Sequence, residues 1–174
     1  MPAPADLRIR VVRDADLDAY KALRDHALAH HEEAFTSDAA TEARRTAQSY
    51  RARLGADVSG GFTLGAWRGD QLVGAITCER DGRSKVRHVG HIVGTMVALD
   101  QQSQGVGRTL LDALIERAGE DAEMQQLTLS VTASNATAVR LYERAGFTRY
   151  GTLPRAIRIA DRYFDKDLMV LNLR

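Results

Sequence analysis

A glycine-containing turn between a strand-like and a helix-like segment constrains the fold of this chain most. The turn is Gln102-Ser103-Gln104-Gly105-Val106-Gly107-Arg108. Residues 90–99 before it are apolar and rich in Ile, Val, Thr and Met, a composition typical of a buried strand. After it, apolar residues recur at helical spacing through about residue 118. The sequence therefore predicts a strand, a tight turn and a helix in direct succession.

The start of this predicted helix is suited to an anion. The first four N–H groups of a helix have no partner inside it, and the helix dipole adds partial positive charge there. Residues 102–111 contain no Asp or Glu, and Arg108 adds a positive charge. Gly105 and Gly107 carry no Cβ, so a ligand can approach their backbone closely. These features indicate a phosphate or pyrophosphate site, although a turn that binds nothing remains the alternative.

Length and composition set broader limits. With 174 residues, 44% hydrophobic and 27% charged, the chain is typical of one soluble globular domain, spanning 1–174. The net charge is +1 and the basic residues are scattered, so we expect no nucleic-acid partner. Cys78 is the only cysteine, which excludes an internal disulfide and a cysteine-based metal cluster. Without a signal-like N-terminus or a membrane-length apolar run, we expect a cytoplasmic protein with no membrane partner and no metal.

The spacing of apolar residues and turn signals predicts an α/β fold. Strands are expected over residues 7–12, 62–67, 72–79, 86–99, 127–133, 147–152 and 162–173. Helices are expected from a cap at Asp14 or Asp16 through about residue 31, and over residues 39–54, 106–121 and 135–146. Gly55 and Gly146 are predicted to stop the second and fourth helices, and Asn135 to cap the fourth.

Two separated stretches resemble the signatures of one family, the GCN5-related N-acetyltransferases (GNAT). The first is Gln102-x-x-Gly105-x-Gly107, and the second is Asn135-Ala-Thr-Ala-Val-Arg-Leu-Tyr142-Glu-Arg-Ala-Gly146-Phe147. One predicted helix and one predicted strand separate them, as in the family. The resemblance covers nearly the whole chain and is specific from about residue 87 to 151. It implies one domain with a mixed, mostly antiparallel sheet of about seven strands flanked by about four helices.

Residues 87–94 and 154–156 further resemble a bacterial subset in which some members acetylate free amino acids. The resemblance implies acetyl-CoA as co-substrate, with its pyrophosphate on the N–H groups of residues 102–108. The backbone of Val97 and Leu99 would bond the pantetheine arm, and Asn135 would add a contact while capping its helix. The cofactor-binding residues implied are Val97, Leu99, Gln102, Ser103, Gln104, Gly105, Val106, Gly107, Arg108, Asn135 and Tyr142.

Tyr142 occupies the family position where a phenol protonates the departing CoA thiolate. A phenol with a pKa near ~10 is a reasonable donor to a thiolate. Periodicity alone favours a core aromatic at this position; the surrounding motif reverses that preference. The general base is less defined, because the strand centre at residues 92–96 has no carboxylate. Glu79 and His91 are the nearby titratable candidates, and a structural role explains each of them equally well.

The resemblance thus implies an N-acetyltransferase that moves acetyl from acetyl-CoA directly to a primary amine in a ternary complex. The expected acceptor is a small molecule, with an amino acid first and a peptide N-terminus or an antibiotic next. The alternative is a non-catalytic acyl-CoA-binding sensor or interaction domain, which the undefined base supports and the retained Tyr142 opposes. A homodimer formed through the last strands is implied by the resemblance alone.

Overall fold

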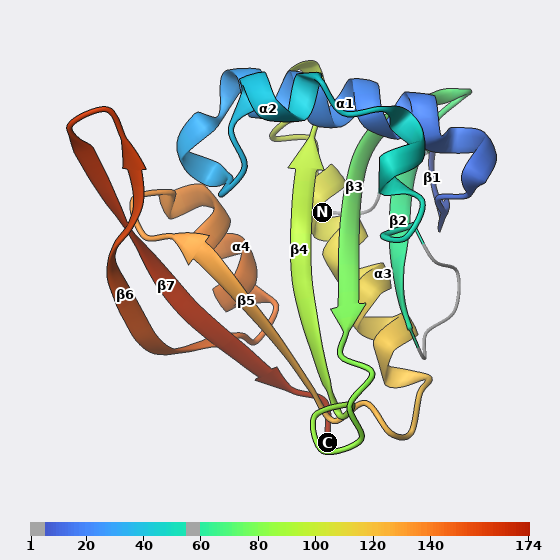
Figure 1. Cartoon of the computed structure of the whole chain (residues 1–174). Coiled ribbons are helices and arrows are strands. Elements are labelled where there is room, and N and C mark those ends of the chain that lie inside the picture. The colour runs from blue at the N-terminus through green and yellow to red at the C-terminus, as the bar shows by residue number, and fades with distance from the viewer. Residues whose placement is uncertain (1–5, 55–59) are drawn as a thin grey trace.

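A computed structural model describes residues 6–54 and 60–174 of the chain. Its sheet has seven strands in the order β1-β2-β3-β4-β5-β7-β6 (Figure 1). The strands are β1 (Leu7–Val11), β2 (Gly61–Arg68), β3 (Gln71–Arg80), β4 (Val89–Val97), β5 (Gln126–Thr132), β6 (Thr148–Ile159) and β7 (Arg162–Asn172). The α-helices of the described part are α1 (Leu17–His30), α2 (Ala39–Ala43), α3 (Val106–Gly119) and α4 (Ala136–Arg144). Only β4 and β5 pair in parallel, so the predicted mixed, mostly antiparallel α/β sheet is confirmed.

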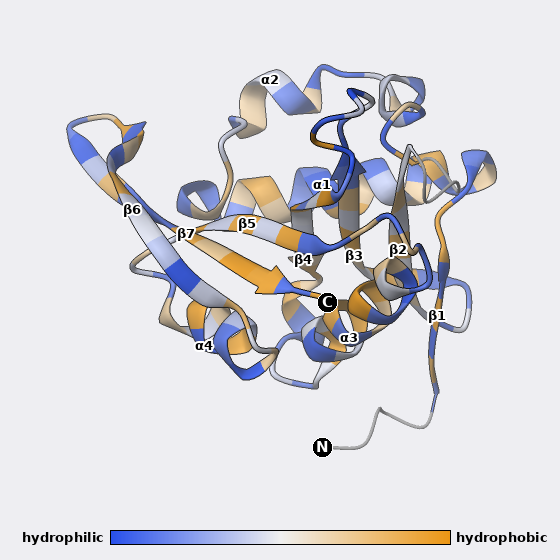
Figure 2. Ribbon diagram, turned by 90° about the horizontal axis from the view of Figure 1, so that it is seen from below, coloured by the Kyte–Doolittle hydropathy of each residue, from blue (hydrophilic) through white to orange (hydrophobic). Residues whose placement is uncertain are grey.

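Helices cover the sheet from both sides, as Figures 1 and 2 show: α3 and α4 lie on one face, and α1 and α2 on the other. Under α3, apolar side chains such as Leu110 and Leu114 are fully buried against Leu127 of β5. Under α1, Tyr20 packs in a second cluster that includes Met96 of β4. The central strands are therefore buried on both faces, which explains their continuous apolar composition. No helix in the described residues has both the length and the apolar composition needed to span a bilayer.

The second predicted helix is wrong over most of its length. Helix α2 ends at Ala43, Thr46 is extended, and residues 47–50 form a separate 3-10 turn. The break lets Glu42 and Tyr50 both turn inward, where Tyr50 Oη donates to Glu42 Oε2 over 2.7 Å. A tertiary contact thus overrides local helical preference here. Gly55, the predicted stop, lies outside the described residues.

Two predicted strand boundaries are also corrected. Strand β4 begins at Val89 rather than residue 86, and it ends at Val97. Strand β6 continues to Ile159, through Pro154 and the residues predicted to be a connection. It lies at the edge of the sheet, where a proline without an N–H is tolerated. Arg155, at φ +54°, lies in a stretch where the pairing register with β7 shifts.

The feature that positions the site is the separation of β4 from β5. The two strands pair only from Val89 to Ile92 on the β4 side, and beyond that point they diverge in a V (Figure 1). On its other edge, β4 carries a bulge against β3, since Thr77 pairs with Val93 but Ala75 with Met96. Gly94 lies in this bulge with φ +60°. The backbone of β4 after Ile92 is therefore open toward β5.

Candidate functional site

The glycine turn leads into α3 with its first N–H groups unshared. Gly105 is the residue before the helix and has φ +82°, a conformation that favours glycine. The first helical backbone bond runs from Thr109 N to Gly105 O, so the N–H groups of Val106, Gly107 and Arg108 have no acceptor within α3. No acidic residue lies in the first turn and no side chain caps it. This local geometry suits the diphosphate of a coenzyme.

Side chains of the turn hold its shape. Gln102 Nε2 lies 3.4 Å from Val97 O and 3.0 Å from His31 Nε2. Gln104 Nε2 donates to Asp100 O over 2.8 Å, and its Oε1 accepts from Arg68 over 3.0 Å. Ser103 is exposed with φ +61°. The two glutamines thus brace the turn while its backbone faces outward.

Arg108 is less available to an anion than its sequence position suggests. Its Nε donates to both carboxylate oxygens of Asp112 at 2.8 Å, and one terminal nitrogen donates to Arg144 O at 3.2 Å. Asp112 lies one turn along α3, so the pair is a surface i,i+4 contact. The positive charge of Arg108 is therefore partly compensated within the chain.

The three residues predicted to contact the pantetheine arm differ in outcome. Val97 is the last residue of β4 and pairs with Gly74 of β3. Leu99 lies beyond the strand in a 3-10 turn, where its carbonyl accepts from Gln102 N, so its placement in an extended strand is wrong. Asn135 caps α4 as predicted, with Oδ1 accepting from Ala138 N over 3.2 Å.

Tyr142 reaches the open part of β4 from α4. It is 6% exposed, and its ring meets Phe147 edge-on at 5.9 Å between centroids. Gly146 follows α4 with φ +97° as predicted, and Phe147 N bonds back to Tyr142 O. Burial raises the pKa of the Tyr142 phenol, while a side-chain hydrogen bond with Thr95 lowers it in part. Because Thr95 follows Gly94 in the bulge, a protonated phenol lies where β4 leaves β5.

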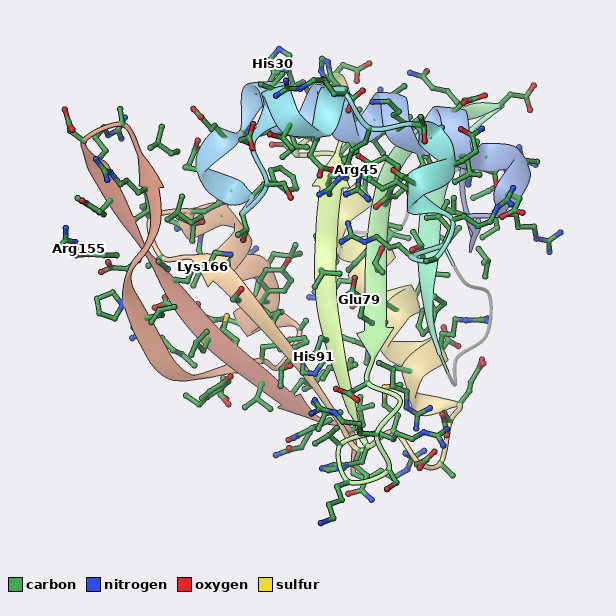
Figure 3. All side chains as sticks on the ribbon, viewed as in Figure 1. His30, Arg45, Glu79, His91, Arg155 and Lys166 are labelled. Atoms are coloured by element: carbon green, nitrogen blue, oxygen red, sulfur yellow. The ribbon has the colours of Figure 1, made fainter. Side chains whose placement is uncertain are left out.

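Glu79 and His91 are neighbours on adjacent strands, paired across β3 and β4 (Figure 3). Glu79 Oε1 lies 3.3 Å from Arg53 Nε, and His91 Nδ1 lies 2.7 Å from Thr128 Oγ1. Both side chains are exposed. His91 precedes Gly94 by three residues, roughly 10 Å along a strand. Both candidate bases therefore lie near the bulge but not beside Tyr142.

Three side chains that sequence reasoning did not assign to the site lie on the α1 side of Gly94: Tyr20 and Arg24 of α1, and Arg53 from the segment after the 3-10 turn. Glu42 of α2 holds Arg24 in this group. Glu42 accepts from Arg24 Nε at 2.8 Å, from Tyr50 Oη and from Arg45. Burial by itself would raise the pKa of Glu42, but these hydrogen bonds together lower it to about 2. The sequence signal that could have identified this group is Arg24, because it places a charged residue on the apolar stripe of α1.

Lys166 also faces this side of the molecule, from β7 (Figure 3). Burial lowers the pKa of its ammonium group, and Nζ donates to Thr36 Oγ1 over 2.9 Å. Thr132 of β5 donates to Glu33 O over 2.6 Å. The segment between α1 and α2 is thereby tied to β5 and to its neighbour β7, on one side of the V.

Comparison with known proteins identifies the same family as the two sequence motifs. The model of the Acetyltransferase (GNAT) family matches residues 20–147. A mycothiol acetyltransferase from Propionibacterium freudenreichii is 32% identical over 154 residues, 86% of this chain and 45% of that protein. An L-methionine sulfoximine/L-methionine sulfone acetyltransferase from Pseudomonas aeruginosa is 35% identical over 74 residues, 42% of each chain. This chain thus spans about half the length of the curated relatives it matches.

Solved structures share the whole fold. The structure of yncA, a putative acetyltransferase from Salmonella typhimurium with its cofactor acetyl-CoA, has a TM-score of 0.80. The alignment covers 98% of this chain and 95% of that one at 23% identity. The family model covers well over half of this sequence, including both motifs. The chain belongs to the GNAT family of acetyltransferases.

Proposed function

We propose that this protein is an acetyl-CoA-dependent N-acetyltransferase that acetylates a primary amine of a small molecule by direct transfer. The observation that carries the proposal is the buried Tyr142 phenol beside Thr95, at the bulge where β4 separates from β5. Family membership and the acetyl-CoA-bound yncA support the choice of co-substrate. The relative named for L-methionine derivatives supports an amino acid as the first acceptor to test.

The residues present fit acetyl-CoA. The open N–H groups of Val106, Gly107 and Arg108 would hold its pyrophosphate, and the unpaired edge of β4 up to Val97 would bond its pantetheine amides. Asn135, whose Oδ1 caps α4, retains its amide NH₂ group for a further contact. When bound, acetyl-CoA supplies the thioester carbonyl that the amine attacks.

Tyr142 acts as the general acid in this proposal. As the carbon–sulfur bond breaks, the phenolic Oη gives its proton to the departing sulfur and later regains one from solvent. The raised pKa keeps the phenol protonated at neutral pH, so the donor is in the required state before each turnover. The backbone N–H groups of the bulge are the available donors to the carbonyl oxygen.

The proton of the amine leaves on the other side of the sheet. Glu79 and His91 are exposed there, and because His91 lies roughly 10 Å along the strand from Gly94, either accepts the proton through water. An α-ammonium group has a pKa near ~8, against ~10.4 for a lysine side chain, so an α-amine demands less of a weak base. This chemistry favours a small acceptor with an α-amine.

The test is release of free CoA thiol from acetyl-CoA with a panel of primary amines. The proposal expects amine-dependent release, and formation of the N-acetyl product by mass spectrometry. Acetyl-CoA binding without transfer to any amine would instead indicate a non-catalytic sensor. The absence of acetyl-CoA binding in calorimetry would reject both functions.

A further inference from the structure

Three hydrogen-bond donors converge on the α1 side of Gly94. A Cβ built on Gly94 would lie 3.7 Å from Tyr20 Oη, 3.9 Å from one terminal nitrogen of Arg24 and 3.9 Å from one of Arg53. The donors come from two segments distant in sequence, α1 and the stretch after residue 50. Tyr20 and Arg24 are one turn apart on α1, so they project from the same face. Because residue 94 is glycine, no side chain of β4 lies between the strand backbone and these three groups.

The Tyr20 hydroxyl is the least expected of these groups. Tyr20 is 0% exposed, and its Oη has no hydrogen-bond partner among the described residues. A buried hydroxyl without a partner is costly, so such a group calls for an explanation. The terminal nitrogen of Arg24 that approaches Gly94 is not the one used toward Glu42 or Ser37. Both groups therefore retain donor capacity directed at Gly94.

Positive charge exceeds negative charge in this cluster. Arg24, Arg45 and Arg53 face two carboxylates, Glu42 and Glu79. Glu42 is already saturated by three donors, and it fixes Arg24 through Nε. Arg53 is only paired loosely, at 3.3 Å from Glu79. One further negative charge would balance the described cluster.

We propose that Tyr20, Arg24 and Arg53 form a binding site for the carboxylate of the acceptor, which is therefore an α-amino acid. This inference rests on the proposed acetyl transfer. A carboxylate offers planar oxygens that match guanidinium donors, and its remaining lone pairs accept a hydrogen bond from the phenol. The near-complete burial of Tyr20 and Arg24 leaves no space for a bulky anion.

The position of the site sets the distance between carboxylate and amine. Gly94 and Thr95 are consecutive in the bulge; the donor cluster lies on the α1 side of Gly94, and Thr95 contacts Tyr142 from α4. The amine must reach a carbonyl beside this same bulge, while the carboxylate lies over Gly94. The two positions therefore belong to consecutive residues of β4, which favours an acceptor whose amine and carboxylate are close together.

The experiment compares α-amino acids with their carboxamides, which keep the α-amine and side chain but lose the negative charge. The wild type should favour the free acids in kcat/KM. Tyr20→Phe removes only the unpartnered hydroxyl and should lower kcat/KM for the acids about tenfold, with little change for the carboxamides. Arg53→Gln should show the same selectivity change. The matched control is Tyr150→Phe, which alters an exposed phenol on β6.

Thermal shift in the presence of amino acids or carboxamides gives a second measurement that does not need turnover. Free acids should raise the melting temperature of the wild type and of Tyr150→Phe more than that of Tyr20→Phe. Equal rates and shifts with acids and carboxamides in the wild type would overturn the carboxylate site. So would a Tyr20→Phe variant that loses both substrates equally. If no amine is acetylated, the proposed transfer fails, and the thermal shifts still decide whether a carboxylate binds here.

Discussion

Replacing Glu42 with Gln should cost this protein about 3 kcal/mol of stability at neutral pH, and most of that cost should disappear at acidic pH. The side chain is 6% exposed and accepts hydrogen bonds from Arg24, Arg45 and Tyr50. The pKa of Glu42 falls from 4.5 to about 2 on folding. A difference of about 2.5 pKa units corresponds to about 3 kcal/mol of folding free energy at neutral pH.

The sign follows from the depressed folded-state pKa. Above the unfolded value of 4.5 the carboxylate is charged in both states and the full stabilisation is present. As pH falls toward about 2, the stabilisation is lost; about 2 of the 3 kcal/mol should disappear between pH 7 and pH 3. The Glu42→Gln substitution leaves Arg24 buried without a countercharge, so the variant should be less stable than the wild type by about 3 kcal/mol at pH 7. This difference in stability should shrink at lower pH, because the wild type loses its own stabilisation there.

Urea unfolding at pH 7, 5, 4 and 3 checks this, with fluorescence of the buried Trp67, the only tryptophan, as the signal. Glu116→Gln is the matched control, since the Glu116 side chain is exposed and makes no hydrogen bond or ion pair with another described residue. It should change the free energy of unfolding by less than about 0.5 kcal/mol at every pH. A Glu42→Gln variant as stable as Glu116→Gln at pH 7, or one destabilised equally at pH 7 and pH 3, would refute the reasoning.

Four further outcomes are expected. Tyr142→Phe should slow turnover at least about 100-fold while leaving acetyl-CoA affinity nearly unchanged by calorimetry; full turnover across pH would remove the general-acid role. Gly107→Trp should abolish acetyl-CoA binding in the same titration, because the indole would occupy the space beside the open N–H groups of the first turn of α3; retained affinity would contradict the placement of the coenzyme. Gly105→Ala should lower the free energy of unfolding by about 1 kcal/mol through its positive φ alone, since no atom crowds the site; an unchanged urea midpoint would argue against that strain. Burial raises the pKa of the Cys78 thiol to about 12, so it should react with a thiol reagent only on unfolding, and rapid labelling of the native protein would show that the thiol is accessible.

The elements predicted correctly are those whose signals are local. The glycine turn before α3, the Asn135 cap and the glycine after α4 each depend on neighbouring residues, and each adopts the expected conformation. The alternation along β1 and β5 likewise reports which face is buried. Errors arose where distant contacts decide, as in residues 39–54, where the link from Glu42 to Arg24 of α1 interrupts a helical pattern.

The residues of the candidate site divide in the same way, between those with a local sequence signal and those placed by distant contacts. The buried position of Tyr142 on α4 could be predicted because its motif is contiguous, whereas the group around Gly94 could not. Tyr20 and Arg53 approach one another only through the packing of α1 over the sheet, and no spacing in the sequence records that. Arg108 shows the limit of a short window, since Asp112, which shares its charge, lies just beyond the residues considered.

The parting of β4 from β5 has a consequence for the cohesion of the molecule. Within the sheet, four residue pairs join β1–β4 to the unit formed by β5, β7 and β6. The bare edge of β4 has the hydrogen-bonding needs of any unpaired strand. An extended molecule with amides along its length would pair with this edge as an additional strand and connect the two parts of the sheet. In the proposed reaction, the donor substrate would then be a structural part of the enzyme for as long as it remained bound.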